Sequence, residues 1–257
     1  MRVLTIAIHT FKESVRQKVL YNLVAFALLL IGASILFGSI SVGVEQIILI
    51  TLGLTSVSVF GLLIAIFIGI DLVSKEIERR TLYNILSKPV SRVEFVLGKY
   101  LGLLLTLLVN TAIMTVGFYG ALYYQEGRLG RSDLVFLGAV YFILLQLAMV
   151  VGLALVFSCI STPVLSAVYT FCLFVIGNFS ADLRTFGEQT QSALVGTVCS
   201  ALYYALPNFA TFNVISLVAH AQAIPGYLWV GNSFYALLYI TMLLALAVLI
   251  FEEREFR

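Results

Sequence analysis

Residues 75–99 read KEIERRTLYNILSKPVSRVEFVLGK, a charged segment between two uncharged ones. The 25 residues from 46 to 70 and the 26 residues from 100 to 125 contain no Asp, Glu, Lys or Arg. A helix needs about 20 apolar residues to cross the hydrocarbon core of a bilayer. Both uncharged segments are therefore predicted to be membrane-spanning helices, and the charged segment is predicted to lie outside the lipid.

The composition extends this prediction to the whole chain. Of the 257 residues, 61% are hydrophobic and 11% are charged, whereas soluble domains are about 45 to 50% apolar. Backbone groups without hydrogen-bond partners are costly in lipid, so membrane spans are helices or closed barrels. Because the apolar runs are continuous and do not alternate with polar residues, they favour helices. The predicted fold class is an all-α integral membrane protein.

Six membrane spans are expected within one domain, residues 1–257. They are predicted at 20–41, 46–70, 95–125, 134–159, 163–181 and 232–251. The other segments are an N-terminal interfacial amphipathic helix at 1–19, a cytoplasmic coupling helix within 71–94 and an external helical element at 182–231. A seventh span at 189–206 is the competing topology.

Local patterns around the charged segment set these boundaries. Pro89 ends the coupling helix, because the residue before a proline is displaced from helical geometry. Ser91 and Glu94 have the spacing of a capping box, which starts the third span. Gly98 and Gly102 on that span would allow another helix to approach closely.

The distribution of basic residues predicts the orientation. With both termini and the charged segment 75–99 in the cytoplasm, twelve of the fifteen Lys and Arg residues lie on the cytoplasmic side. Arg128, Arg131 and Arg184 then lie outside, as the positive-inside rule favours. The net charge of +2 is too small to favour nucleic-acid binding.

Motifs of catalytic and metal sites are absent from the sequence. There is no HExxH, GxSxG or GxxxxGK[ST] pattern, and His9 and His220 are isolated. Cys159, Cys172 and Cys199 do not have the spacing of a metal site or a disulfide framework. We therefore expect that the chain is not an enzyme by itself and that it binds no metal and no cofactor.

Polar residues within the predicted spans are mostly amides. Apart from Lys99 at the start of the third span, the spans contain no charged residue. This argues against a proton-coupled carrier, which needs a titrating group in the membrane. The candidates for lining a pathway are Asn110, Gln146 and Asn178. Each of them could instead form a hydrogen bond to a neighbouring helix.

The charged segment resembles a known element. Its runs 76–82 and 86–92, followed by Gly98-Lys99, are similar to the second cytoplasmic segment of ABC type-2 transporter permeases, with Arg80 where glycine is frequent. Ile6-Ala7, Leu206-Pro207-Asn208 and residues 251–256 extend the resemblance along the chain. The pattern is most similar to the permease subunits of nitrous oxide reductase maturation systems.

This resemblance implies a fold, a set of partners and a location. It implies a six-helix subunit of the type V exporter fold in the bacterial cytoplasmic membrane, paired with a second permease copy. Two ATP-binding-cassette ATPase subunits would bind ATP and Mg and drive export or extraction of an unidentified substrate. The residues expected to couple to them are Glu76, Ile77, Glu78, Arg79, Arg80, Thr81, Leu82, Ile85, Leu86, Lys88, Pro89 and Arg92.

Two other interpretations remain open from the sequence. The element at 182–231 contains the only tryptophan, Trp229, and would suit a membrane-anchored assembly protein that docks a periplasmic partner and transports nothing. A basic cluster beside a span is also typical of a loop that only contacts lipid headgroups.

Overall fold

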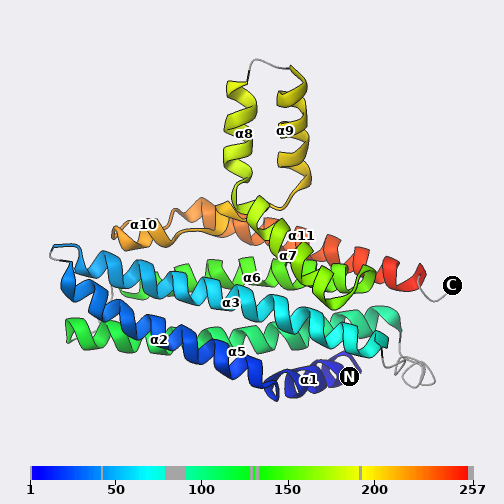
Figure 1. Ribbon diagram of the computed structural model, residues 1–257, viewed down its shortest axis with the longest axis horizontal. Coiled ribbons are helices and arrows are strands. Elements are labelled where there is room, and N and C mark those ends of the chain that lie inside the picture. Colours follow the sequence, from blue (N-terminus) through cyan, green and yellow to red (C-terminus); the bar gives the residue numbers. More distant parts are fainter. Residues whose placement is uncertain are drawn as a thin grey trace.

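The computed structural model describes residues 2–41, 43–78, 91–127, 130, 133–190 and 193–253, which form a helical bundle (Figure 1). Its long helices are α2 (Lys18–Ile40), α3 (Glu45–Glu78), α5 (Arg92–Glu126), α6 (Leu134–Ile160) and α11 (Gly226–Glu253). Each of these five is long and apolar enough to cross a membrane. The shorter elements are α1 (Arg2–Val15), α7 (Pro163–Asn178), α8 (Ser180–Gln189), α9 (Ala193–Ala205), the 3₁₀ helix η2 (Ala210–Phe212) and α10 (Ile215–Ala219).

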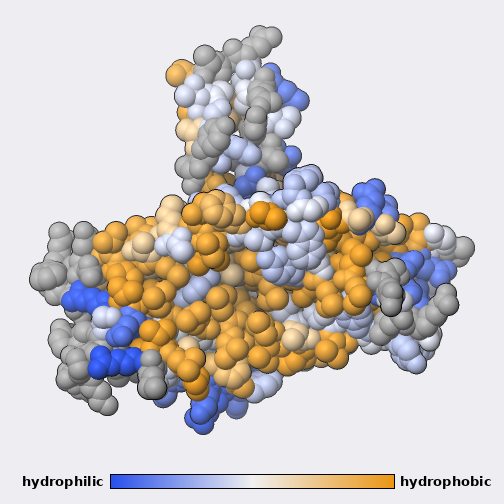
Figure 2. All heavy atoms as spheres, turned by 180° about the vertical axis from the view of Figure 1, so that it is seen from behind, coloured by the Kyte–Doolittle hydropathy of each residue, from blue (hydrophilic) through white to orange (hydrophobic). Residues whose placement is uncertain are grey.

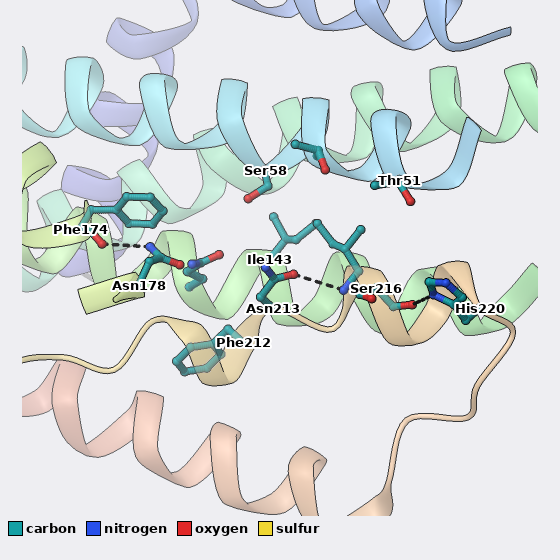
Figure 3. Close-up of a pocket in the computed structure, with 12 residues that line it drawn as sticks. Thr51, Ser58, Ile143, Phe174, Asn178, Phe212, Asn213, Ser216 and His220 are labelled. Carbon is teal, nitrogen blue, oxygen red and sulfur yellow. Dashed lines mark hydrogen bonds between the residues drawn. The ribbon is translucent and has the colours of Figure 1, made fainter. Parts of the chain in front are cut away.

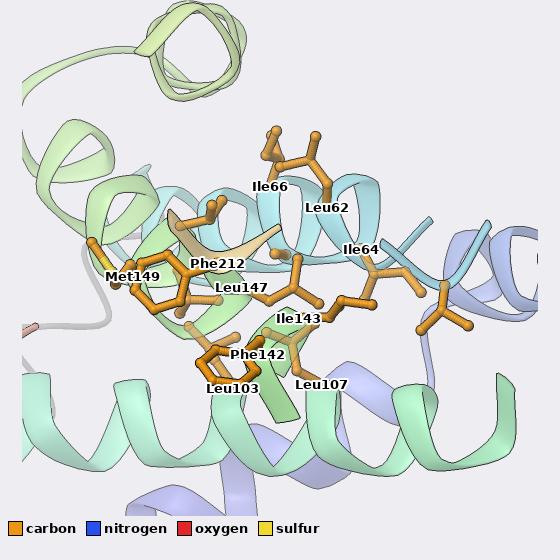
Figure 4. Close-up of a cluster of buried hydrophobic side chains, with 14 of the residues drawn as sticks. Leu62, Ile64, Ile66, Leu103, Leu107, Phe142, Ile143, Leu147, Met149 and Phe212 are labelled. Carbon is orange, nitrogen blue, oxygen red and sulfur yellow. The ribbon is translucent and has the colours of Figure 1, made fainter. Parts of the chain in front are cut away.

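The hydrophobic core lies between α3, α5 and α6 (Figure 4). Ile64 of α3, Leu103 of α5 and Phe142 of α6 are at most 1% exposed. The most apolar window of α6 is 78% buried, compared with 28% for α2 and for α11. The helix at the centre of the bundle is therefore α6, and α2 and α11 leave most of their surface to lipid or to another protein. Since lipid is as apolar as a leucine side chain, close packing drives this association.

The surface of the bundle has the pattern of a membrane protein. In Figure 2, hydrophobic residues cover the side of the bundle, and hydrophilic residues gather mainly towards its two ends. Helices that run across a bilayer present this apolar band to the hydrocarbon and keep their polar termini in water. The chain is thus a multi-pass membrane protein with an all-helical fold in its described residues.

Helix α1 packs on the first turns of α5 through two glycines. A Cβ atom added at Gly102 would lie 2.6 Å from the carbonyl oxygen of Ala7, and one added at Gly98 would also collide with α1. The close helix contact predicted for the Gly98/Gly102 pair is therefore present, and α1 is the helix that makes it. The apolar residues Leu4 and Ile8 of α1 are 65% and 43% exposed, which leaves them available to lipid.

The region from 163 to 219 differs from the sequence expectation. The expected span 163–181 is a 16-residue helix, α7, that ends at Asn178. Such a helix covers about 24 Å, less than the roughly 30 Å of hydrocarbon. Residues 209–219, which the sequence assigns to the external element 182–231, contact α3 and α6 inside the bundle. Phe209 and Phe212 are 0% and 1% exposed because they belong to the core.

Helices α8 and α9 form a hairpin that projects from the bundle (Figure 1). The two ends of this hairpin are held together at its base, where the backbone N–H of Phe209 donates to the carbonyl oxygen of Gly177 at 3.1 Å. The proposed seventh span at 189–206 corresponds to the 13-residue helix α9. A helix of that length covers about 20 Å and does not cross a bilayer alone.

Candidate functional site

The ends of α3 and α5 flank the predicted coupling segment. Helix α3 continues without a break from the apolar residues 46–70 to Glu78. The backbone of Glu76, Ile77 and Glu78 therefore forms the last turn of a membrane helix. The predicted coupling residues that lie outside the described part of the chain are Arg79, Arg80, Thr81, Leu82, Ile85, Leu86, Lys88 and Pro89.

The start of α5 is fixed by the capping box that the sequence predicts. The backbone N–H of Glu94 donates to Ser91 Oγ at 3.3 Å, and the backbone N–H of Ser91 donates to Glu94 Oε2 at 3.1 Å. Two N–H groups at the helix start are thereby satisfied. Arg92 occupies the first helical position, directly after this cap.

Phe95 connects the start of α5 to the end of α11. The rings of Phe95 and Phe251 are stacked, with their centroids 5.7 Å apart. Lys99 Nζ lies 5.8 Å from the centroid of the Phe95 ring, a position in which a cation is attracted to the ring face. Lys99 is 4% exposed, so this basic residue lies in the protein interior, although the sequence pattern groups it with solvent-facing charges.

A polar groove of about 360 Å³ lies between α3, α6, α7 and residues 212–220 (Figure 3). Helix α3 contributes Thr51, Thr55 and Ser58, at spacings of four and three that put them on one helix face. The apolar part of the wall comes from Phe174 and Phe212, together with an isoleucine of α6 and one of α10.

Two of the three predicted pathway amides line this groove. Gln146 Nε2 lies 3.5 Å from the carbonyl oxygen of Phe209, and Asn178 Nδ2 donates to the carbonyl oxygen of Phe174 at 2.9 Å. Asn110 lies in α5, is 3% exposed and does not line the groove. Its side-chain amide donates to the carbonyl oxygen of Thr106 in its own helix, and not to the neighbouring helix that the sequence left open as a partner.

The sequence patterns do not identify the other polar residues of the groove. Asn213, Ser216 and His220 come from the segment expected outside the bundle, and His220 Nδ1 lies 2.8 Å from the carbonyl oxygen of Ser216. The hydroxyl residues of α3 also give little signal, because hydroxyls within helices usually bond to their own backbone. The spacing from Thr51 to Ser58 along one face is the signal that could have identified them.

Metal-binding side chains do not cluster in the described part of the chain, where no group of three or more His, Cys, Asp or Glu residues is close enough to hold an ion. Cys159 and Cys199 are buried, Cys172 is exposed, and none of the three forms a disulfide. The groove therefore offers hydroxyl, amide and imidazole groups, which bind a solute through hydrogen bonds.

A family model described as "ABC-2 family transporter protein" matches residues 4–256. The chain belongs to the ABC-2 family. A search of curated proteins found no match. The family match includes the coupling segment and every helix that lines the groove. This ABC-2 protein is a membrane-spanning permease component of an ABC transporter, and such subunits are generally not enzymes themselves.

Proposed function

We propose that this chain couples ATP hydrolysis by two separate ATP-binding-cassette ATPase subunits to export or extraction of a substrate. ATP and Mg bind to those subunits, and the ABC-2 permease contacts them through residues 76–92. The main supporting observation is that α3 is a single helix from the groove to the start of this segment. Family membership supports the pairing with ATPase subunits.

Helix α3 is the mechanical link in this proposal. From Thr51 in the groove to Glu78 at its end, α3 has a length of about 40 Å. Because its backbone hydrogen bonds continue without a break, a displacement at Glu78 moves the groove wall rather than bending a loop. On the other side of the coupling segment, the Ser91 cap and the contact between Phe95 and Phe251 hold α5 in position.

The fifth of six spans, in this proposal, consists of α7 followed by residues 209–219. Both parts contact α3 and α6, and the hydrogen bond between Phe209 and Gly177 joins them where α7 ends. A second copy of the permease, identical or paired, would face the groove. Thr55 and Ser216 are exposed on the side of the bundle, where lipid would leave their hydroxyl groups without hydrogen-bond partners.

A cytoplasmic position of both termini agrees with the shape of the bundle. The N-terminal end of α1 and the C-terminal end of α11 lie at the same end of the bundle as the last turn of α3 (Figure 1). The sequence assigns twelve of its fifteen Lys and Arg residues to the cytoplasmic segments, which supports placing this end of the bundle on the cytoplasmic side of a bacterial inner membrane. The similarity to nitrous oxide reductase maturation permeases supports a periplasmic partner protein, or a cargo that is used to assemble a periplasmic protein.

The second candidate function is docking of a periplasmic protein without transport. The observation behind it is the α8–α9 hairpin, which leaves the bundle between the two parts of the fifth span and whose helices pack mainly against each other, with their other faces open. Phe186, Leu194 and Val198 on this hairpin are 59%, 80% and 56% exposed. Loss of partner binding on removal of the hairpin, from a protein that shows no flux with the hairpin present, would support docking without transport. Retained flux would instead assign transport to the bundle.

The coupling role is tested by reversing charge in the segment 79–90. We expect the double change Arg79→Glu and Arg80→Glu to weaken binding of the ATPase subunits at least tenfold, or about 1.4 kcal/mol, because it reverses the charge of two residues proposed to face them. Co-purification of the ATPase subunits and ATP hydrolysis by the complex are the measurements. The matched control is Arg128→Glu with Arg131→Glu, which reverses the same number of charges in the sequence just after α5. This control should change neither co-purification nor ATP hydrolysis. Unaltered co-purification of the Arg79/Arg80 variant would refute the docking role.

A further inference from the structure

We propose that the groove is a binding site for a small uncharged molecule that has hydroxyl or amide groups on one side and an apolar surface on the other. The further step of treating this molecule as the transported cargo rests on the transport function proposed above. Four features of the groove support this binding role: its depth in the membrane, the lack of partners for its α3 hydroxyl groups among the described residues, the lack of charge on its wall, and its volume.

The groove reaches into the middle of the bilayer. Thr51 and Ser58 lie six and thirteen residues after Glu45, the charged residue at the start of α3, or about 9 and 20 Å along the helix. The hydrocarbon core is about 30 Å thick. Polar groups at this depth are costly unless they form hydrogen bonds. The groove therefore requires water or a polar solute to fill it.

The hydroxyl groups of α3 in the groove differ from other hydroxyls in the bundle. Ser56, on another face of α3, donates to the carbonyl oxygen of Leu52 at 2.7 Å, as many helical Ser and Thr residues do. For Thr51, Thr55 and Ser58, no hydrogen-bond partner is found among the described residues. In Figure 3, the hydroxyls of Thr51 and Ser58 point away from α3. Their hydrogen-bonding capacity is available to a ligand.

The wall of the groove selects against charged ligands. None of its twelve lining residues is Asp, Glu, Lys or Arg. An ion that left water for this site would lose its hydration without gaining a partner of opposite charge, which costs several kcal/mol. The titratable group on the wall is His220, whose exposed ring lies beside the carbonyl oxygen of Ser216.

The remaining wall chemistry defines the ligand class. Hydroxyl and amide groups both donate and accept hydrogen bonds, so they complement a ligand with the same two capacities. Phe174 and Phe212 supply apolar surface within the same groove. A volume of about 360 Å³ is near the lower end of the usual range for small-molecule pockets. The site fits one small molecule and is too small for a lipid with two acyl chains.

The test measures which solutes reach a thiol placed in the groove. Cys159, Cys172 and Cys199 are first replaced by alanine in the full-length chain, and Ser58→Cys or Thr51→Cys is then introduced. Membranes that contain each variant react with three methanethiosulfonates of similar size, the uncharged 2-hydroxyethyl, the anionic sulfonatoethyl and the cationic trimethylammonioethyl reagents. Each rate is divided by the rate of the same reagent with 2-mercaptoethanol, so that intrinsic reactivity cancels.

We expect the hydroxyethyl reagent to react at least tenfold faster than either charged reagent at both positions. Ser56→Cys is the matched control on the same helix, and it should react with none of the three because Ser56 is 6% exposed. A smaller preference for the uncharged reagent, or no reaction at either groove position, would overturn the proposal. Because the assay contains neither ATP nor ATPase subunits, a negative result would not contradict the proposed coupling function. Conversely, a negative result in the Arg79/Arg80 test would not contradict ligand binding in the groove.

Discussion

At the scale of single residues, Ala221 has an unusual backbone conformation. Its φ is 55°, in the left-handed region that favours glycine. It follows α10 in a Schellman motif, where the N–H of Ala221 donates to the carbonyl oxygen of Val218 and the N–H of Gln222 donates to that of Leu217, both at 3.0 Å. The turn directs the chain from the groove residue His220 towards α11.

Ala221→Gly should stabilise the protein by about 1 kcal/mol, because glycine adopts this conformation without a steric penalty. The expected result is a higher thermal-unfolding midpoint of the purified protein in detergent micelles. Ala219→Gly, two residues earlier within α10, is the control and should lower the midpoint through the cost of glycine in a helix. An Ala221→Gly variant that unfolds at or below the wild-type temperature would contradict the interpretation.

At the scale of elements, the two glycines at the start of α5 determine how α1 packs. Gly102→Ala should destabilise the protein by about 1 to 3 kcal/mol, since the added methyl group meets backbone rather than a flexible side chain. Gly120→Ala on the same helix is the matched control, because a Cβ atom there has nothing within 4 Å. That control should gain about 0.5 to 1 kcal/mol from the better helix former.

The measurement compares thermal midpoints and tryptic cleavage at Lys12 in α1. Faster cleavage of Gly102→Ala than of Gly120→Ala is expected, because a displaced α1 exposes its backbone to the protease. Equal midpoints and equal cleavage of the two variants would show that α1 does not depend on this contact.

Sequence patterns predict the long helices of the bundle. The long uncharged runs predict α2, α3, α5, α6 and α11 as helices, and the spacing of Ser91 and Glu94 predicts the start of α5. Only local residues determine these features, so local patterns are sufficient. The Gly98/Gly102 spacing predicts a close contact but not its partner, because packing between distant segments chooses α1.

The arrangement of residues 178–219 depends on long-range contacts that no local pattern encodes. The N–H of Phe209 bonds to α7, and the N–H of Asn208 donates to Tyr235 Oη at 2.9 Å. Asn232 Nδ2 donates to the carbonyl oxygen of Thr211 at 2.7 Å. Residues 189–251 contain no charge that would mark a boundary. The return of this segment into the bundle, and with it five of the twelve residues that line the groove, could not be predicted for that reason.

At the scale of the whole molecule, the α8–α9 hairpin contacts the bundle mainly at its base. Its ends meet at the hydrogen bond between Gly177 and Phe209, and a Cβ atom at Gly177 would lie 2.3 Å from the carbonyl oxygen of Pro207. A variant in which a short glycine linker replaces residues 181–205 should therefore stay monodisperse on gel filtration, with a thermal midpoint close to that of the wild type.

The control for this deletion is removal of residues 207–219, which should prevent folding because Phe209 and Phe212 fill the core. Aggregation of the hairpin-deleted variant would mean that the hairpin supports the bundle. Retained folding would make this variant the reagent for separating periplasmic docking from transport, since it lacks the exposed apolar residues of the hairpin.

The continuity of α3 has a thermodynamic consequence. One helix bears the groove hydroxyls and ends at the segment proposed to meet the ATPase subunits. Thermodynamic linkage is reciprocal. If nucleotide binding changes the affinity of the groove for cargo by a given factor, cargo in the groove changes the affinity of the ATPase subunits for nucleotide by the same factor. Titration of a fluorescent nucleotide analogue, with and without cargo, would then report groove occupancy from a distance of about 40 Å.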